Sequence, residues 1–274
     1  MSSRDLSPDA IGLLAGDAKV GLLATVDPKG LPHVTLITSL AAKTPQMLMF
    51  GQFSEGLSKT HVRSHPQVGF LALDGERRWL RGKAVWRSSA RKGEDFEAYN
   101  RKPMFRYNAY FGIHTVHYLD VVEVEEGGEL GVPGLVVGAV LARVVRLAAV
   151  ERNATPALTP WAVTLLSRAA TLKFASYVSK DAHPCIIPGV AACTAGAGRM
   201  VVACPSVDLA TASIPDGADV AVFALDRELH SVLVRGRVTS RRSIGGSHIS
   251  ALDIDWVYNS MPPKHGQIFP QINC

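Results

Sequence analysis

Two histidines, His61 and His65, have the spacing that places both rings on one face of a helix, where they could bind a metal ion. The sequence offers no third ligand near this pair, so we expect no metal site there. The chain has four cysteines, all in its second half and without a Cys-x-x-Cys spacing, which is typical of reduced and mostly buried thiols. They are Cys185, Cys193, Cys204 and Cys274.

No combination of nucleophile and base is recognisable in the sequence, because no Ser-His-Asp set, Cys-His set or carboxylate pair stands out. The triplet Gly196-Ala197-Gly198 is too short for a dinucleotide-binding loop and predicts an ordinary β-turn. His114 and His117 lie in an aromatic-rich stretch, where they could contact a haem or a substrate, or simply pack. We therefore expect any chemistry to come from a bound cofactor.

The elements that would hold such a cofactor occur twice in the chain. Residues 7–74 and 159–226 share thirteen identities at a constant offset of 152 positions, whereas chance would give roughly five at ordinary composition. A capped helix, a turn with proline and an Arg-Gly-Lys/Arg strand motif also recur, the motif at Arg81-Gly82-Lys83 and Arg235-Gly236-Arg237. These repeats indicate a tandem duplication, in which differences between the copies report on function.

Composition limits the class of protein. The chain has 274 residues, of which 47% are hydrophobic and 19% charged, which predicts two globular domains that each bury a core. The longest apolar run, Leu135 to Ala142, is too short to cross a membrane, and no signal peptide is recognisable, so we expect a cytoplasmic protein without a membrane partner. The net charge of +5 indicates a solvated basic face or an attraction for an anionic cofactor rather than a nucleic-acid partner.

Local signals predict an antiparallel barrel with appended helices rather than an alternating βαβ pattern. Ser7 caps a first helix that begins at Pro8, and Asp27 to Gly30 form a hairpin turn. The remaining expected elements of the first copy are strands 20–26, 31–40, 46–50, 67–73, 79–86, 119–125 and 135–147, a loop at 41–45, and helices 54–65 and 93–99. The expected domains are 1–147 and 159–274, joined by a linker at 148–158.

The order of three segments resembles the pyridoxamine 5'-phosphate oxidase-like FMN-binding split-barrel superfamily. They read KVGLLATVDPKGLPHVTLI from Lys19, MLMFGQFSEGLSKTHVRSHPQVGFLAL from Met47 and RWLRGKAV from Arg78. The resemblance covers about 20–125 well and 170–257 more weakly. It implies a mainly β (α+β) fold of two antiparallel split β-barrels in one chain, each with short appended helices, packed as an intramolecular pseudo-dimer. In that family FMN lies between two barrels, which here would be the two copies.

The resemblance also implies a site for the cofactor's phosphate. The family uses a helix start rich in Ser, Thr, Arg and Lys after the third strand, and the matching positions are Ser58, Lys59 and Thr60, with Arg63 one turn later. Lys59 would supply a positive charge, the two hydroxyl groups would donate hydrogen bonds, and the helix start would add backbone N–H groups.

Further contacts with the cofactor are implied on the strands. A polar residue of the second strand assists the phosphate site in the family, and His33 or Thr38 occupies that place here. Backbone groups of the same strand would adjust the reactivity of the flavin ring; these residues are Val34, Thr35 and Leu36. The second copy would close the site with residues near its second hairpin and its last long strand, namely Ser231, His230, Trp256 and Tyr258.

Comparison of the copies predicts one cofactor per chain. At the offset of 152, the four residues of the phosphate site become Ala210, Thr211, Ala212 and Pro215. Every positive charge is lost, Asp208 adds a negative one, and proline disfavours a continuing helix. We therefore expect the first copy to bind the phosphate and the second copy to serve as a wall and lid.

These expectations lead to an FMN-dependent oxidoreductase that uses a small-molecule electron donor or acceptor such as NADH or NADPH. Pyridoxamine-phosphate oxidation itself is disfavoured, because its Arg-rich substrate contacts cannot be placed on this sequence. The alternatives are a deazaflavin-dependent reductase, a split-barrel haem protein with His114, His117 or His265 as axial ligand, and a non-catalytic flavin binder. The chain would be a monomeric pseudo-dimer or a homodimer of it.

Overall fold

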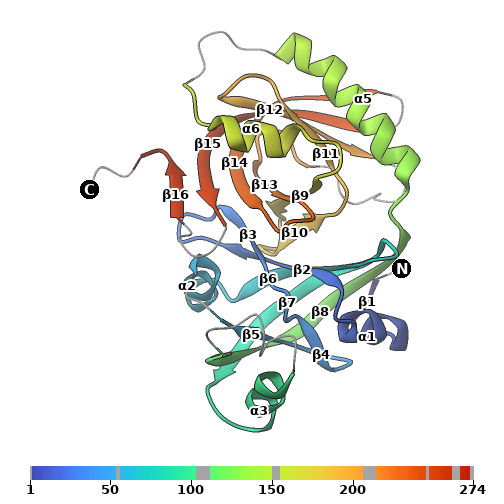
Figure 1. Ribbon diagram of the computed structural model, residues 1–274, viewed down its shortest axis with the longest axis vertical. Helices are drawn as coiled ribbons and strands as arrows, with labels where there is room; N and C mark the ends of the chain where they lie inside the picture. Colours follow the sequence, from blue (N-terminus) through green and yellow to red (C-terminus); the bar gives the residue numbers. More distant parts are fainter. Residues whose placement is uncertain are drawn as a thin grey trace. The chain divides into compact units, whose positions relative to one another are not determined.

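The computed structural model describes residues 2–53, 56–102, 112–149, 155–205, 214–244, 247–260 and 266–271. The chain divides into two compact units, each containing most of one antiparallel sheet (Figure 1). Unit 1 comprises Met1–Gly30, Thr35–Leu130 and Ser179–Ile186, and unit 2 comprises Leu31–Val34, Gly131–Val178 and Ile187–Cys274. Each unit thus includes one short hairpin segment from the other half of the sequence.

The first sheet has the strand order β3-β2-β6-β7-β8-β5-β4, and β1 pairs with β8. Helices α1 to α3 interrupt its strands. The bounds are β1 (Ser2–Ser3), α1 (Pro8–Ala15), β2 (Lys19–Val26), β3 (Pro32–Leu36), β4 (Ala41–Thr44), β5 (Met47–Gln52), α2 (Leu57–Ser64), β6 (Gln67–Asp74), β7 (Arg78–Ala90), α3 (Glu94–Arg101) and β8 (Thr115–Glu129).

The second sheet has the order β10-β9-β13-β14-β15-β12-β11, and β16 pairs with β15. The bounds are α5 (Val132–Ala149), α6 (Pro160–Ser167), β9 (Leu172–Val178), β10 (Pro184–Ile187), β11 (Ala191–Thr194), β12 (Arg199–Pro205), β13 (Asp219–Leu225), β14 (Ser231–Ile244), β15 (Ser247–Asn259) and β16 (Gly266–Phe269).

The two sheets have the same topology when each strand is replaced by its counterpart seven strands later. Their registers agree as well: Leu22 pairs with Leu71 in the first sheet, and Phe174 pairs with Phe223 in the second, both shifted by the offset of the repeat. The predicted fold class, a mainly β protein with two antiparallel barrel-like halves, is confirmed.

The helix that opens each half begins in the same way. The Ser7 side chain accepts a hydrogen bond from the Ala10 N–H at 3.0 Å, and Thr159 does the same for Ala162 at 3.3 Å. A proline follows each cap, where its missing N–H costs nothing. The buried side chains of the first helix include Leu14, which packs into the apolar core of the first sheet together with residues such as Phe50 and Phe70.

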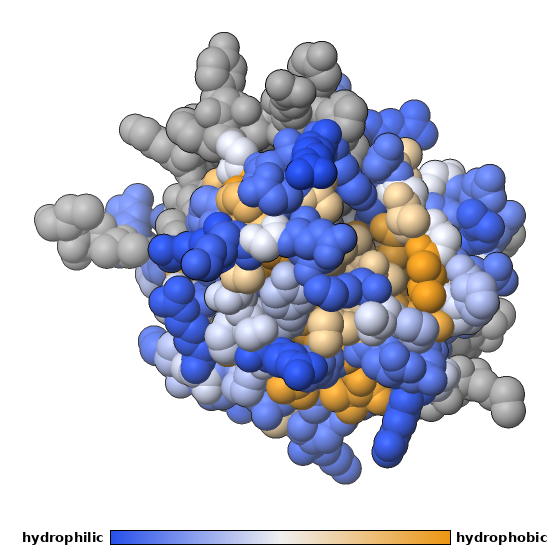
Figure 2. Space-filling view, turned by 90° about the horizontal axis from the view of Figure 1, so that it is seen from below, coloured by the Kyte–Doolittle hydropathy of each residue, from blue (hydrophilic) through white to orange (hydrophobic). Residues whose placement is uncertain are grey.

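The surface drawn in Figure 2 is mostly hydrophilic, and its apolar residues form separate patches. Within the described parts of the chain, no helix is long and apolar enough to cross a membrane.

The strand predicted at 135–147 is wrong, because these residues belong to helix α5. Their many β-branched residues favour a strand, but packing decides otherwise. One face of the helix carries small residues that pack on β11 and β12: Ala142 is buried, and a Cβ added to Gly138 would lie 3.3 Å from the Ala191 Cβ. The first unit gives way to the second after Leu130, whereas the sequence predicted the boundary at a linker over residues 148–158. The first two residues of that predicted linker are the last two of α5.

Helix α5 covers the second sheet as α3 covers the first (Figure 1). In the first half, α3 lies between β7 and β8, and its Tyr99 packs with Val116 and Tyr118 of β8. In the second half, β14 ends at Ile244 and β15 begins at Ser247, so their connection is too short for a helix. The segment between the two halves of the sequence supplies the covering helix instead.

Three smaller predictions also need correction. The predicted loop at 41–45 contains β4, which pairs with β5, and the strand predicted at 31–40 ends at Leu36. The Arg-Gly motifs do not mark equivalent positions, because Arg81 pairs with Leu71 whereas Leu233 pairs with Phe223. The counterpart of Arg81 is therefore Leu233.

By the same register, Lys83 pairs with Gly69 and Arg235 pairs with Ala221, at the constant offset of 152. Arg235 is therefore the counterpart of Lys83 rather than of Arg81.

Candidate functional site

The start of helix α2 in unit 1 has the features of an anion-binding site. Its N-cap residue is Gly56, and no side chain caps the helix. The first N–H groups of a helix lack intrahelical partners and carry partial positive charge. The Lys59 ammonium lies at this end of the helix, since a Cβ added to Gly56 would be 3.5 Å from the Lys59 Nζ.

A pair of hydroxyl groups lies beside this helix start. Ser58 is buried, and its Oγ lies 2.5 Å from the Oγ1 of Thr35 on the part of β3 that belongs to unit 1. The structure thus brings together Thr35 and Ser58, two of the residues that the sequence predicts for the cofactor. Thr60 is exposed, because positions two residues apart point to different sides of a helix.

Thr38 does not lie on the strand as predicted: β3 ends at Leu36, and Thr38 is an exposed turn residue. Leu36 is half-buried. The chain turns here because the Ile37 N–H bonds the Gly21 carbonyl at 2.7 Å, and the Leu40 N–H then bonds the Ile37 carbonyl.

A hydrogen-bonded chain of polar side chains, buried at Gln52 and His117 and half-buried at Trp86, links three strands of unit 1. The Trp86 indole N–H lies 3.2 Å from Nδ1 of His117, and Nε2 of His117 lies 2.8 Å from Oε1 of Gln52. The indole nitrogen is only a donor and Oε1 only an acceptor, so the His117 proton is on Nε2 and the ring is neutral. The ring also stacks on Phe50, with centroids 4.7 Å apart.

The surroundings of His117 are positive. Burial and, to a smaller extent, the positive charges of Lys59, Arg63 and His114 together lower the pKa of His117 to about 4. The cations of α2 therefore create a field that favours an anion in this part of unit 1. Sequence reasoning missed Gln52 and Trp86, because no local pattern links residues that are 65 and 31 positions from His117.

Hydrogen bonds occupy both ring nitrogens of His117, so this histidine could bind a haem iron only if it gave up one of them. His114 is exposed, and its Nδ1 lies 3.0 Å from the Thr115 hydroxyl. His265 lies outside the described residues.

Unit 2 contains a cluster of rings that joins three of the predicted residues. His33, from the segment Leu31–Val34, makes edge-on contacts with Trp256 at 5.9 Å and Tyr258 at 5.6 Å between centroids. Trp256 and Tyr258 stack at 5.2 Å, and the Arg235 guanidinium lies 4.8 Å from the centre of the Trp256 ring. The Trp256 indole N–H also donates to Oε1 of Gln267 at 2.9 Å.

The counterpart positions in unit 1 hold ion pairs instead of rings. Strand register makes Glu123 and Glu125 the counterparts of Trp256 and Tyr258, because they pair with the equivalent residues of the preceding strand. The Lys83 ammonium lies 3.0 Å from Glu123 and 2.9 Å from Asp181, while Nε and NH2 of Arg81 donate to Glu125 at 2.8 and 2.6 Å. The two halves therefore share a fold but differ in the chemistry of these positions.

Ser231 and Val34 are buried, and both belong to unit 2. Ser231 begins β14, four residues before Arg235, so alternation along the strand places both on one face of the sheet. Ser231 thus shares a face with a member of the ring cluster, whereas His230 lies in the turn before the strand.

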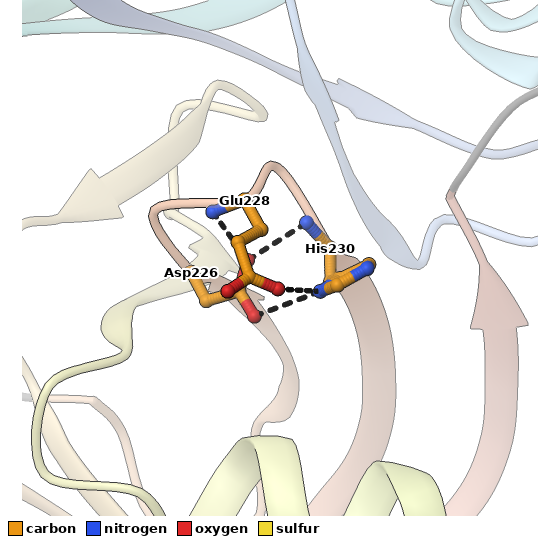
Figure 3. Close-up of side chains that lie close together, drawn as sticks. All are labelled: Asp226, Glu228 and His230. Carbon is orange, nitrogen blue, oxygen red and sulfur yellow. Dashed lines mark hydrogen bonds and ion pairs between the residues drawn. The ribbon is translucent and has the colours of Figure 1, made fainter.

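That turn brings Asp226, Glu228 and His230 together, and within the described residues it is the one group with the geometry for a metal ion (Figure 3). Nδ1 of His230 lies 3.0 Å from Asp226 and 3.5 Å from Glu228. Burial raises the pKa of Asp226, but the hydrogen bonds from His230 and Glu228 lower it more, so the pKa lies below its usual value.

The equivalent turn of the first half explains this group without a metal. Asp74 accepts backbone N–H bonds from Glu76 and Arg78 and a side-chain bond from Arg78 at 2.8 Å, as Asp226 does from the residues two and four positions later. The group of Figure 3 is therefore a hydrogen-bonded turn in which His230 takes the place of Arg78.

The pair His61 and His65 belongs to no metal-binding group among the described residues. Nδ1 of the buried His61 lies 3.1 Å from the Thr25 hydroxyl, so this histidine has a structural role in the core. Cys193 and Cys204 are buried and Cys185 is half-buried, all three as free thiols, and Cys274 lies outside the described residues.

Comparisons with known proteins concern the fold. No family model matches the chain, and no curated protein sequence does. Similar solved structures include HupZ from Group A Streptococcus (16% identity, 46% of this chain and 98% of that chain, TM-score 0.37) and a putative pyridoxamine 5'-phosphate oxidase from Lactobacillus delbrueckii (19%, 45% and 95%, 0.36). An FMN-binding protein from Syntrophomonas wolfei is also similar (15%, 44% and 85%, 0.37).

Each of these matches spans most of its own chain but less than half of this one. Within the chain itself, each half forms one antiparallel sheet, and the two sheets have the same order of seven strands.

Proposed function

We propose that this chain is a flavoprotein that binds the phosphate of FMN at the start of α2 and uses the flavin in an oxidoreductase reaction with a small-molecule electron donor or acceptor. The observation that carries the proposal is the uncapped helix start with the Lys59 ammonium beside it. A phosphate monoester is recognised by backbone N–H groups, a cation and hydroxyl donors, and Ser58 and Thr35 add the hydroxyl groups.

The protein's share of the chemistry is binding and orientation. FMN, when bound, supplies one- and two-electron transfer, and no catalytic side chain needs to be assigned. Within unit 1, Thr35 and Leu36 are candidates for backbone contacts with the flavin ring.

The absorption spectrum of natively purified protein tests the class of cofactor. We expect a flavin spectrum, or its appearance on titration with FMN. A deazaflavin or haem spectrum would replace the proposal with one of its alternatives, and a protein that neither carries nor binds a flavin would end it. Anaerobic addition of NADH or NADPH separates a reductase, which bleaches the flavin, from a non-catalytic binder.

Lys59→Ala tests the position of the phosphate site. A hydrogen bond to a charged group contributes roughly 1.5–3 kcal/mol, so we expect the Kd for FMN to rise about 10- to 100-fold. Binding of riboflavin, which lacks the phosphate, should be nearly unchanged. The matched control is Lys102→Ala, which removes an exposed lysine at the end of α3 and should alter neither affinity.

A further inference from the structure

We infer that the Trp86–His117–Gln52 chain is a positioning element for the anion site at the start of α2, with His117 as its central positioning residue. The inference rests on the proposed function, since it assigns a role at that same site. None of the three residues needs to touch the cofactor, because they act by fixing the end of strand β5, from which the polypeptide continues toward helix α2.

The position of Gln52 explains how the effect reaches the helix. Gln52 is the last residue of β5, four positions before the N-cap Gly56. Its side-chain oxygen accepts from His117, and its backbone carbonyl accepts from the His114 N–H at 3.1 Å. Both its side chain and its main chain are therefore tied to β8 and the residue before it, which fixes where the segment leading to Lys59 begins.

The second half of the chain shows that the fold itself does not require this arrangement. Strand register makes Val238, Ser250 and Cys204 the counterparts of Trp86, His117 and Gln52. Valine cannot donate the hydrogen bond that tryptophan makes, so the same sheet forms in unit 2 without this hydrogen-bonded chain of three side chains. Burying polar side chains costs free energy unless they are paired, so their presence in one half only calls for a reason beyond folding.

The charges coincide with this difference between the halves. The half that has the polar chain also has Lys59 and Arg63, while the other has Thr211 and Pro215 at those sequence positions. The charged or titratable groups that act on His117 are Lys59 and Arg63 from α2 and His114 before β8; its neighbours Trp86 and Gln52 are uncharged. An anion at the helix start cancels part of this positive field, so it should raise the pKa of His117.

Two measurements test the inference together. The first compares FMN and riboflavin binding in His117→Phe, which keeps an aromatic ring beside Phe50 but removes both hydrogen bonds. We expect about a tenfold rise in the Kd for FMN, the effect of one well-aligned hydrogen bond on the phosphate, and no change for riboflavin. The matched control is Ser250→Ala at the counterpart position, which should change neither.

The second measurement follows the His117 ring by NMR during titration with inorganic phosphate. We expect its pKa, about 4 without phosphate, to rise on phosphate binding, and the nitrogen shifts to report a proton on Nε2. If His117→Phe does not fold, Trp86→Phe replaces it, with a smaller rise in the Kd for FMN and a mixture of His117 tautomers expected.

The outcomes are distinguishable. Wild-type affinity for FMN in a folded His117→Phe or Trp86→Phe variant overturns the inference and leaves the proposed function intact. An equal loss for FMN and riboflavin also overturns it, because a general structural role would produce that result. If the wild-type protein binds neither flavin, the proposed function fails, and an unchanged His117 pKa in phosphate then overturns the inference as well.

Discussion

A pair of identical substitutions on opposite faces of α5 tests whether residues 135–147 form the helix that covers the second sheet. Ala142 is 1% exposed and packs against the second sheet, whereas Val140 is 55% exposed. We expect Ala142→Asp to destabilise the protein strongly and Val140→Asp to have little effect. Both positions are in the middle of the helix, and the helix propensities of alanine and valine differ by less than about 0.7 kcal/mol, which is small compared with the effect of burying a carboxylate.

The magnitude follows from burial. Leaving a carboxylate buried without a partner costs roughly 3–5 kcal/mol, while a surface substitution usually changes the free energy of unfolding by about 0.5 kcal/mol or less. For a domain of this size, a loss of about 3 kcal/mol lowers the Tm by roughly 6–12 °C. The two variants should therefore be separated by several degrees in thermal unfolding followed by circular dichroism.

The comparison also has a clear contrary result. In a strand, residues 140 and 142 would point to the same face, because side chains alternate along an extended chain. In a helix they are about 200° apart around the axis. Equal destabilisation by the two substitutions would therefore refute the helix and its packing on the second sheet.

Three further substitutions test contacts that distinguish the two halves. Glu125→Ala leaves the guanidinium of Arg81, which is 8% exposed, without its carboxylate partner. This should lower the free energy of unfolding by about 2–3 kcal/mol in a denaturant titration, less than for a fully buried pair because Glu125 is partly exposed. No loss of stability would show that the ion pair is not stabilising. Lys83→Ala should raise the pKa of Asp181 from about 2 toward 3.8, as read by NMR. Because this lowered pKa contributes stability above pH 3.8 that is lost as the pH falls through about 2, the variant should also unfold at higher pH in acid; an unchanged acid midpoint would contradict the pairing. Titration with Zn²⁺ should give the same result for the wild-type protein and for His230→Ala, since the turn of Figure 3 matches a turn of the first half in which Arg78 takes the place of His230. Tight Zn²⁺ binding that is lost in His230→Ala would show that the group is a metal site.

The architecture was predictable because the repeat carries the topology. The matched helix caps at Ser7 and Thr159 and the constant offset of the strands appear in the structure as equivalent helices and registers. Local sequence signals of this kind involve neighbouring residues, so one sequence is enough to read them.

Other features were not predictable because they depend on packing between distant segments. Helix α5 contains β-branched residues that favour a strand, and its small inward residues become meaningful only against Ala191 and Ala203. The Trp86–His117–Gln52 chain joins three strands by hydrogen bonds that cannot be predicted from the spacing of these residues in the sequence.

The prediction that the two Arg-Gly motifs occupy equivalent positions was wrong for a related reason. A short motif can recur at positions that the register of the sheet does not equate, and here Arg235 matches Lys83 rather than Arg81. Ser58 and Lys59 could be proposed as site residues from the sequence, whereas the residues that surround them, Gln52, Trp86 and His117, could not be connected to them.

The most direct test of the central claim is the number of FMN molecules bound per chain, measured by titration of the cofactor-free protein. We predict one FMN per chain, because Lys59 and Arg63 of the first half have Thr211 and Pro215, which carry no charge, at the equivalent sequence positions. Lys59→Ala should raise the Kd of this binding by about 10- to 100-fold. Two FMN molecules per chain, or a single FMN unaffected by Lys59→Ala, would contradict the account.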